Sequence, residues 1–301
     1  MKVLITGATG LVGQEIVKLL LQKGISVNYL TTSKAKLSCE PNYKGFYWDV
    51  NSGKIDTDAF DQVGVIIHLA GATVAKRWTN AYKEEILDSR VQTTRLLYNS
   101  LQKINHQVTQ IISASAIGIY PDSLTKVYHE TDTETEASFL GNVVEKWEEE
   151  VNIFKKLNLV VAKIRIGIVF AKEGGALQEM VKPIKLGVGA SFGSGKQYQS
   201  WIHISDLAAI FYHIIEHKSA GIYNGVSPYP VTNELLTKAI AKTLDKPLFL
   251  PNIPQFIMKL LLGEMHQLLF SSQHVSCRKL LNENFQFKYA SLDKALHDLL
   301  K

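Results

Sequence analysis

Three glycines near the start of the chain have the spacing of a turn that could hold phosphate. Gly7, Gly10 and Gly13 follow a short β-branched run, Val3–Thr6, and open the first predicted helix, 11–22. Glycines allow a tight turn and let the backbone approach a pyrophosphate, which unpaired N–H groups at a helix start then hold. Such glycines can also serve packing alone, but the strand before them and the helix after them favour dinucleotide binding.

The residues at the end of the second predicted strand bear on which dinucleotide is bound. NAD-selective sites usually carry Asp or Glu there to hold the ribose hydroxyls. This chain instead has Leu30, Thr31, Thr32, Ser33 and Lys34, without a carboxylate. Hydroxyls and an ammonium group can accept a 2′-phosphate, so NADP(H) is favoured over NAD(H). A plain solvated turn is the alternative interpretation.

The elements that must position these residues alternate along the first 165 residues. Short apolar runs followed by longer helical patterns predict a parallel sheet with crossover helices. We expect an α/β fold, a Rossmann-type doubly wound parallel sheet with a smaller, mostly helical C-terminal substrate lobe. The dinucleotide-binding domain is predicted at 1–165, with 203–225 returning to it, and the lobe at 166–202 and 226–301. The predicted strands are Val3–Thr6, Ser26–Thr31, Gly45–Trp48, Val65–Leu69, Gln110–Ala114, Val160–Ile164 and Ile222–Asn224.

One predicted helix, 137–156, has an apolar stripe that should pack against the sheet. The stripe includes Val143, Trp147 and Val151. Glu148 falls outside it and is expected on the solvent side.

Two histidine-containing motifs are interpreted as structural. His203 and Asp206 stand where a helix begins, so Asp206 or Ser205 is expected to cap it while His203 packs behind. The run from His213 to His217 matches the H-x-x-E-H pattern of inverted zinc peptidases. It flanks an apolar stripe and has no third ligand at a suitable motif, so no metal is expected.

Composition narrows the class of protein. Hydrophobic residues make up 46% and charged residues 20%, which is typical of a soluble globular chain. The net charge of +5 is spread along the chain, so nucleic-acid binding is not indicated. Two cysteines, without a CxxC pair, suggest a reducing compartment. The chain shows no signal-peptide pattern and no apolar run of membrane-spanning length, so we expect a cytoplasmic protein without membrane association.

A set of short motifs occurs along essentially the whole chain. In combination they resemble the extended short-chain dehydrogenase/reductases, and more narrowly an atypical, nucleotide-sugar epimerase-like branch with a small C-terminal domain. The broader resemblance rests on the glycine spacing, Asp49, His68–Gly71, Ser113–Ser115, Trp201–Asp206 and Tyr223–Asn224. The narrower one rests on Lys76–Trp78, Asp88–Arg90, Gly174–Leu177, Gly193–Gly195, Ser200–His203, Leu250–Pro251, Leu262–Glu264, Ser272–Val275, Lys279–Leu280 and Phe285–Phe287.

The resemblance implies that residues at the ends of several strands contact the cofactor. Arg90 is the charged candidate, because a guanidinium there could reach phosphate or ribose oxygens; an ordinary surface ion pair is the alternative. The habit of that superfamily also implies a homodimer through the helices after the fourth and fifth strands. The implied cofactor-binding residues are Gly7, Ala8, Thr9, Gly10, Leu11, Val12, Thr31, Thr32, Ser33, Asp49, Leu69, Ala70, Gly71, Glu85, Arg90, Ser113 and Ile168.

Proton transfer is where the chain departs from that superfamily. Its enzymes typically use Tyr and Lys one helical turn apart, because the nearby ammonium lowers the phenol pKa. None of the 12 tyrosines has a lysine four residues later, and the corresponding helix carries Phe139. The remaining catalytic candidates are Ser115, which could polarise a carbonyl, and Tyr120, which could supply a phenol. A loop-capping serine and a packed aromatic are the alternatives.

Two functions therefore stay open. The first is an NADP(H)-dependent oxidoreductase or epimerase-like enzyme acting on an unidentified small carbonyl or hydroxyl substrate. The second is a non-catalytic dinucleotide-binding protein, such as a redox sensor or regulator. A glycine-rich segment and the helical lobe favour the enzyme, since together they could enclose a cleft. Gln199 stands where nucleotide-sugar enzymes of the superfamily tend to have arginine, which weakens a nucleotide sugar as substrate.

Overall fold

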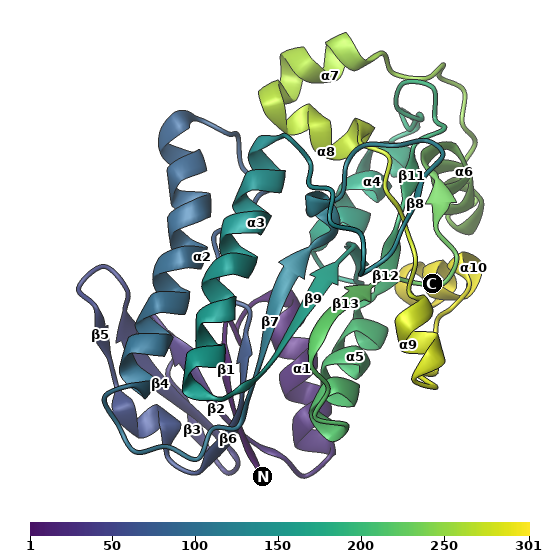
Figure 1. Ribbon diagram of the computed structural model, residues 1–301. Coiled ribbons are helices and arrows are strands. Elements are labelled where there is room, and N and C mark those ends of the chain that lie inside the picture. The colour runs from purple at the N-terminus through teal and green to yellow at the C-terminus, as the bar shows by residue number, and fades with distance from the viewer.

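A mostly parallel, nine-stranded sheet runs through the molecule (Figure 1). The computed structural model describes all 301 residues. The strands of the sheet are β1 (Lys2–Thr6), β2 (Ser26–Thr31), β3 (Cys39–Glu40), β4 (Tyr43–Asp49), β5 (Lys54–Ile55), β6 (Val63–His68), β7 (Gln110–Ala116), β9 (Val160–Ile166) and β13 (Gly221–Gly225). Their order is β13-β9-β7-β6-β1-β2-β4-β3, and β5 pairs with β4. Only β3 and β5 run antiparallel to their neighbour.

The strand order makes the sheet doubly wound. From β1 the chain adds β2 and β4 on one side, then crosses to β6 and adds β7, β9 and β13 on the other. The winding reverses between β1 and β6, which is where ligands bind in open α/β sheets. The predicted fold class is therefore confirmed, and every predicted strand falls within an observed one except at Leu69, one residue beyond β6. The division into domains stays a prediction, although β13 does lie in the main sheet.

Helices cover both faces of the sheet (Figure 1). The helices α1 (Leu11–Gln22) and α5 (Ile204–Glu216) pack together on one face, and α2 (Asn80–Leu101) and α3 (Phe139–Asn152) pack together on the other. Because side chains alternate along a strand, Val3 and Ile5 enter the core under α1 and α5, while Leu4 enters the core under α2 and α3. Both faces of β1 are thus apolar, as expected for a buried parallel strand.

The helix α3 differs from its sequence interpretation in one residue. Val143, Trp147 and Val151 are buried as expected. Glu148, expected on the solvent side, is also buried. A residue next to Trp147 is only 100° away around the helix, so a broad apolar stripe can include it, and a partner inside the protein can then hold its charge. The predicted helix 137–156 is otherwise confirmed, with Ser138 as N-cap and a 3-10 turn, Ile153–Leu157, as its end.

The C-terminal half adds a mostly helical lobe at the carboxyl ends of the strands (Figure 1). Three of its helices, α4 (Gly175–Lys185), α6 (Asn233–Thr243) and α10 (Leu292–Leu300), share a core with Phe170 and Trp201. No helix has the length and apolarity needed to cross a membrane. The other helices are α7 (Gln255–Leu262), α8 (Gln267–Phe270) and α9 (Arg278–Asn282). The paired short strands are β8 (Val127–Tyr128) with β15 (His274–Val275), β10 (Ile168–Phe170) with β12 (Trp201–His203), and β11 (Tyr198–Gln199) with β14 (Val231–Thr232).

The start of α5 is capped differently from the expectation. His203 itself is the cap, since its Nδ1 accepts a hydrogen bond from the backbone N–H of Ser205 at 3.1 Å. The carboxylate of Asp206 instead accepts from the backbone N–H groups of Lys288 and Tyr289, at 2.8 and 2.9 Å. Asp206 therefore holds the C-terminal segment against α5.

Candidate functional site

The glycine turn after β1 has the shape that a pyrophosphate needs. Gly7 has a φ of +73° and its carbonyl accepts from the N–H of Gly10 at 3.0 Å. A Cβ on Gly13 would lie 2.2 Å from that same carbonyl oxygen, so only glycine lets α1 pack this closely on the turn. Gly10 caps α1 without a side chain, and the first turn has no acidic residue. The N–H groups at the start of α1 are therefore left for an anion.

A chain of buried hydrogen bonds joins the end of β1 to the end of β6. The Thr6 hydroxyl accepts from the N–H groups of Leu69 and Ala70, both at 3.1 Å, and donates to Nδ1 of His68 at 2.7 Å. Nε2 of His68 in turn donates to the Thr94 hydroxyl at 3.0 Å. Burial lowers the pKa of His68 to about 3, so the ring is neutral. Because the Thr94 hydroxyl donates to the carbonyl of Arg90 at 2.6 Å, it accepts from His68, and the ring proton is on Nε2. The link brings Leu69–Gly71 beside Gly7, as the resemblance implies.

The side chain of Arg90, on α2, also reaches the carboxyl-end edge of the sheet, where it lies beside the residues that follow β6. Its Nη1 donates to the carbonyls of Ala72 and Ile86 at 3.2 and 2.8 Å, and its guanidinium lies 5.1 Å from the centre of the Trp147 ring. A Cβ on Gly71 would lie 3.2 Å from the guanidinium carbon. Burial lowers the pKa of Arg90 to about 10, and no carboxylate forms an ion pair with it within 4.0 Å. The surface ion pair weighed as the alternative is therefore not present, and a positive charge without an acidic partner stands at this edge.

The ends of β2 and β4 lie side by side, because Thr31 pairs with Tyr47. The buried Thr31 hydroxyl accepts from the N–H of Ser33 at 3.2 Å, while Thr32 and Lys34 are exposed. Lys34 Nζ lies 5.3 Å from the centre of the Tyr47 ring. Asp49, at the end of β4, accepts from the N–H groups of the next turn, and its bonds with Ser52 lower its pKa.

Three other implied residues have less direct geometry. Glu85 is exposed on α2 and makes no side-chain hydrogen bond. The Ser113 hydroxyl is buried and donates to the carbonyl of Ala114 at 2.8 Å. Ile168 lies in β10, paired with Trp201. Contacts between these residues and a cofactor stay predictions.

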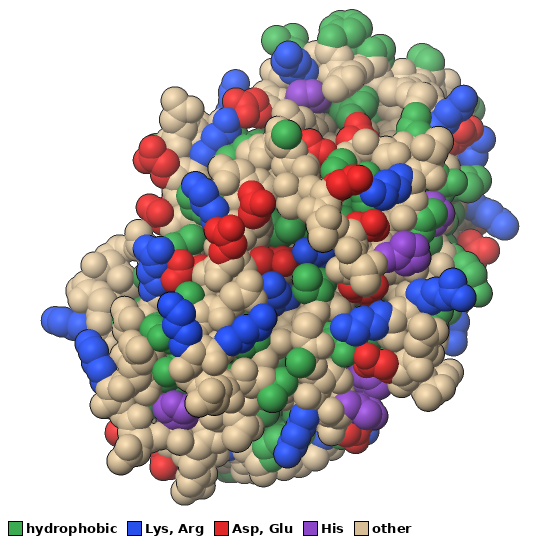
Figure 2. Space-filling view, viewed as in Figure 1, with side chains coloured by type: hydrophobic (Ala, Val, Ile, Leu, Met, Phe, Trp, Pro, Cys, Tyr) green, Lys and Arg blue, Asp and Glu red, His purple; other side chains and the backbone are tan.

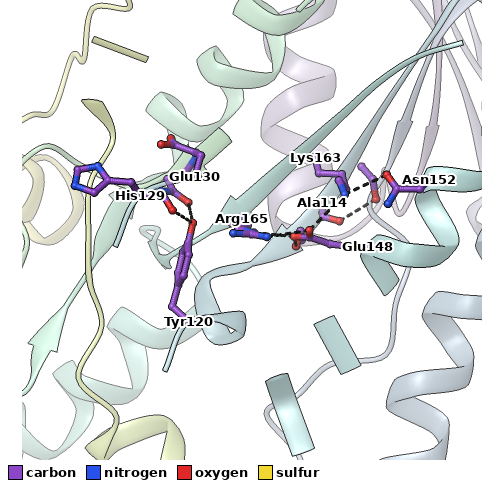
Figure 3. A network of polar contacts seen from close by, with 11 residues as sticks. Ala114, Tyr120, His129, Glu130, Glu148, Asn152, Lys163 and Arg165 are labelled. Carbon is purple, nitrogen blue, oxygen red and sulfur yellow. Dashed lines mark hydrogen bonds and ion pairs between the residues drawn. The ribbon is translucent and has the colours of Figure 1, made fainter. Parts of the chain in front are cut away.

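Ser115, a predicted catalytic residue, is hydrogen-bonded to a buried ionic cluster. Figure 3 shows Glu148, Lys163 and Arg165 of this cluster. The Ser115 hydroxyl donates to Oε1 of Glu148 at 2.6 Å. Arg165 donates to both oxygens of that carboxylate, through Nε at 2.8 Å and Nη2 at 3.1 Å, and Lys163 Nζ lies 3.4 Å from Oε2. Burial alone would raise the pKa of Glu148, but the bonds and charge of Arg165, helped by Lys163, outweigh burial and hold the pKa below its ordinary value. The carboxylate is therefore ionised and fully engaged.

Tyr120 is packed on the other side of Arg165 (Figure 3). Its ring centre lies 4.9 Å from the guanidinium carbon. Its hydroxyl donates to Oδ1 of Asn224 at 2.8 Å and lies 3.1 Å from the carbonyl oxygen of His129. Burial raises the pKa of Tyr120. Both candidate hydroxyls are thus buried and bonded, and the catalytic roles of Ser115 and Tyr120 stay predictions.

Sequence reasoning missed Glu148, Lys163 and Arg165. A pattern that could have found them is the presence of two cations two residues apart, one inside the predicted apolar strand Val160–Ile164 and one directly after it. Side chains at that spacing point to the same face, so both enter the same core. Buried cations require an anionic partner, and a glutamate beside Trp147 in the preceding helix was available.

The comparisons with known proteins agree with this arrangement. A model of the NAD dependent epimerase/dehydratase family matches residues 3–141, and a model of a domain of unknown function, DUF1731, matches residues 253–299. An epimerase family protein of Staphylococcus epidermidis is 35% identical over 299 residues, which cover 99% of this chain and 98% of that protein. A Staphylococcus aureus epimerase family protein has the same identity and coverage. The chain belongs to the NAD-dependent epimerase/dehydratase family.

Solved structures extend this family likeness to the fold. Human epimerase family protein SDR39U1, isoform 2, solved with NADPH, has a TM-score of 0.84 at 27% identity and covers 99% of both chains. The nucleoside-diphosphate sugar epimerase from Corynebacterium glutamicum has a TM-score of 0.79 at 29% identity over 99% of this chain and 58% of that one. UDP-N-acetylglucosamine 4-epimerase from Bacillus cereus, at 18% identity and a TM-score of 0.76, shares the fold alone. The resemblance inferred from the motifs is thus confirmed.

Proposed function

We propose that this family member binds NADP(H) at the β1/β6 edge and acts on a small carbonyl or hydroxyl substrate. The observation that carries the proposal is the uncapped start of α1 beside Arg90, a cation without an acidic partner. The residues fit the cofactor, since the turn and helix start would hold its pyrophosphate and Arg90 would stabilise a nearby phosphate or ribose oxygen. When bound, the cofactor supplies the hydride chemistry.

The preference for NADP(H) is supported by the end of β2. Thr31, Thr32 and Ser33 bring hydroxyls and no carboxylate, and Lys34 is exposed beside Tyr47. An ammonium group favours a 2′-phosphate over a free hydroxyl. The structural neighbour solved with NADPH is consistent with this preference.

A second function, dinucleotide binding without turnover, is favoured by one specific observation. The hydroxyls of Ser115 and Tyr120 are both buried and hydrogen-bonded within the protein, and α3 carries Phe139 where the superfamily has its tyrosine. In the enzyme, either hydroxyl would have to exchange its present partner for the substrate. A homodimer and a cytoplasmic location stay predictions alongside both functions.

Calorimetric titration with NADPH and NADH tests the binding step first. We expect micromolar-range affinity for NADPH, in the ordinary range for cofactors and substrates, and weaker binding of NADH. A screen of carbonyl substrates, following nicotinamide absorbance with the wild type and Tyr120→Phe, then separates the two functions. Turnover that depends on Tyr120 supports the enzyme, whereas tight binding without turnover supports the second function, a non-catalytic dinucleotide-binding protein. Absence of NADPH and NADH binding would contradict both.

A further inference from the structure

A recess of about 900 Å³ lies at the β13 edge of the sheet. Its walls are the first halves of β9 and β13, the end of α3 with the turn that follows, the loop 129–131, and α9. Strands β9, β7 and β6 separate β13 from β1, so the recess shares no wall with the glycine turn. It is therefore a feature apart from the proposed dinucleotide site.

The charges that line the recess are predominantly positive. The two carboxylates are already bonded to the walls, because Glu130 accepts from the N–H of Asn224 at 3.0 Å and Glu283 accepts from the Tyr223 hydroxyl at 2.8 Å. The four cationic side chains are Lys155, Lys163, Arg278 and Lys279. Lys163 also pairs with Glu148, so the other three cations against two carboxylates leave a formal excess of one positive charge.

Two of these cations, Lys163 and Lys279, are held by contacts within the protein, and Lys163 Nζ donates to Oδ1 of Asn152 at 3.2 Å. Lys163 on β9 pairs in register with Ile222 on β13, and Lys279 Nζ donates to the carbonyl of Ile222 at 2.7 Å. Lys279 also lies 3.6 Å from the centre of the Tyr223 ring. Burial lowers the pKa of both lysines, because little water reaches either ammonium. Each ammonium group is thus held in place by a polar group of the protein, Asn152 for Lys163 and the Ile222 carbonyl for Lys279.

The other two cations stand free at the rim. Lys155 and Arg278 are exposed, and neither forms an ion pair with a carboxylate within 4.0 Å. Figure 2 shows Lys and Arg side chains on this face, interspersed with acidic ones, between α3 and the C-terminal helices. The recess therefore combines two ammonium groups held by the protein with two exposed cations at its rim.

We infer that this recess binds a small, multiply charged anion bearing phosphate or carboxylate groups, at a site separate from the dinucleotide edge. Such a ligand would compensate the positive charge and take charge-assisted hydrogen bonds from ammonium and guanidinium groups. The volume is within the ordinary range for small-molecule sites. Lys163 connects the recess to the ionic cluster, since its ammonium is also 3.4 Å from Glu148 (Figure 3).

Calorimetric titration with pyrophosphate at about 0.15 M ionic strength, where the charges of exposed side chains are screened beyond about 8 Å, tests the inference. The test variant is Lys155→Gln/Arg278→Gln, and the control is Lys146→Gln/Lys156→Gln, which removes the same two charges from exposed positions near the recess that do not line it. We expect saturable binding to the wild type, weakened about tenfold in the test variant by the loss of two charge-assisted contacts. The control should stay within about twofold of the wild type, as surface charges act weakly at a distance.

Several outcomes would overturn the inference. One is absence of saturable binding, and another is equal weakening in both double variants, which would show only diffuse attraction to a basic surface. Wild-type affinity in the test variant would place pyrophosphate elsewhere, as at the glycine turn. Because neither double variant alters the β1/β6 edge, NADPH titration of the same proteins reports separately on the proposed function.

Discussion

At the carboxyl ends of the parallel strands, two neighbouring regions of the sheet differ in whether their polar groups are free or already bonded. At β1 and β6, the groups available to a ligand are backbone N–H groups and small residues, with one cation that lacks an acidic partner. At β7 and β9, the polar side chains of Ser115, Glu148 and Arg165 are bonded to one another inside the core. The first region offers groups that a ligand could bind, whereas in the second the Glu148 carboxylate is fully engaged and only Nη1 of Arg165 lacks a partner.

The difference shows that binding and proton transfer depend on separate parts of the fold. Backbone geometry can hold a dinucleotide without any particular side chain. Proton transfer requires a side chain of suitable pKa that is free to meet the substrate. In this chain the backbone geometry lies at β1 and β6, and the ionic cluster lies at β7 and β9, so the two regions can be altered independently.

The largest effect is expected from Glu148→Ala, which disrupts the ionic cluster at β7 and β9. The substitution leaves Lys163 and Arg165 buried without their carboxylate; their side chains are only 9% and 6% exposed. Removing one partner of a buried ion pair costs about 3–5 kcal/mol. Urea unfolding should show a loss of this size, and the exposed neighbour Glu149→Ala should change stability by less than about 0.5 kcal/mol. Equal losses in both variants would contradict a stabilising role for the cluster.

The same contrast explains what the sequence could predict. The strands, α1 and the glycine turn were predicted, because the pattern of hydrophobic residues and the spacing of the glycines are local properties of the chain. Arg90 and Thr31, which the resemblance implies as cofactor-binding, lie near the ends of β6 and β2, and their contacts with a cofactor stay predictions. The ionic cluster was missed because it joins α3 to β7 and β9, and a contact between distant segments leaves no mark in the spacing of one helix. Glu148 was wrongly expected in solvent for that reason.

Gly13→Ala should disrupt the glycine turn in the open region at β1 and β6. The new Cβ would lie 2.2 Å from the carbonyl oxygen of Gly7, so α1 must move away from the turn. Overpacking of this kind costs about 1–3 kcal/mol, and the displaced N–H groups should no longer fit a pyrophosphate. Thermal unfolding and NADPH titration should both show the loss. Gly64→Ala meets nothing within 4 Å and serves as the control; unchanged NADPH affinity in Gly13→Ala would contradict the proposed site.

Arg90→Gln removes the side-chain charge near the end of β6 that lacks an acidic partner. We expect NADPH affinity to fall about tenfold, equivalent to about 1.4 kcal/mol, because a charge-assisted contact is lost. Arg95→Gln on the same helix is the control, since Arg95 is 62% exposed and pairs with Glu150. Arg90→Lys should give an intermediate affinity, as it keeps the charge without the planar guanidinium. If Arg90→Gln and Arg95→Gln behave alike, Arg90 does not contact the cofactor.

The hydrogen-bond chain through His68 should make stability depend on pH. Burial lowers the pKa of His68 from 6.5 to about 3, so the unfolded chain takes up a proton that the folded protein refuses. The stabilisation is complete above about pH 6.5 and is lost as the pH falls toward 3, with a slope of up to about 1.4 kcal/mol per pH unit. Urea unfolding of His68→Gln should show a shallower slope between about pH 6 and 5, whatever its absolute stability. An unchanged slope would mean that His68 is protonated in the folded protein.

The smallest effect concerns which dinucleotide the open region prefers. Lys34 is exposed beside Tyr47, so its charge is partly screened by water. Lys34→Gln should therefore weaken NADPH binding only about threefold, since exposed charge pairs are worth less than about 1 kcal/mol, and leave NADH binding unchanged. Lys36→Gln, two residues further on and also exposed, controls for general surface charge. A parallel fall for NADPH and NADH in Lys34→Gln would show that the ammonium attracts the whole dinucleotide rather than its 2′-phosphate. In that case the hydroxyls of Thr32 and Ser33 would be the remaining source of any preference for NADP(H).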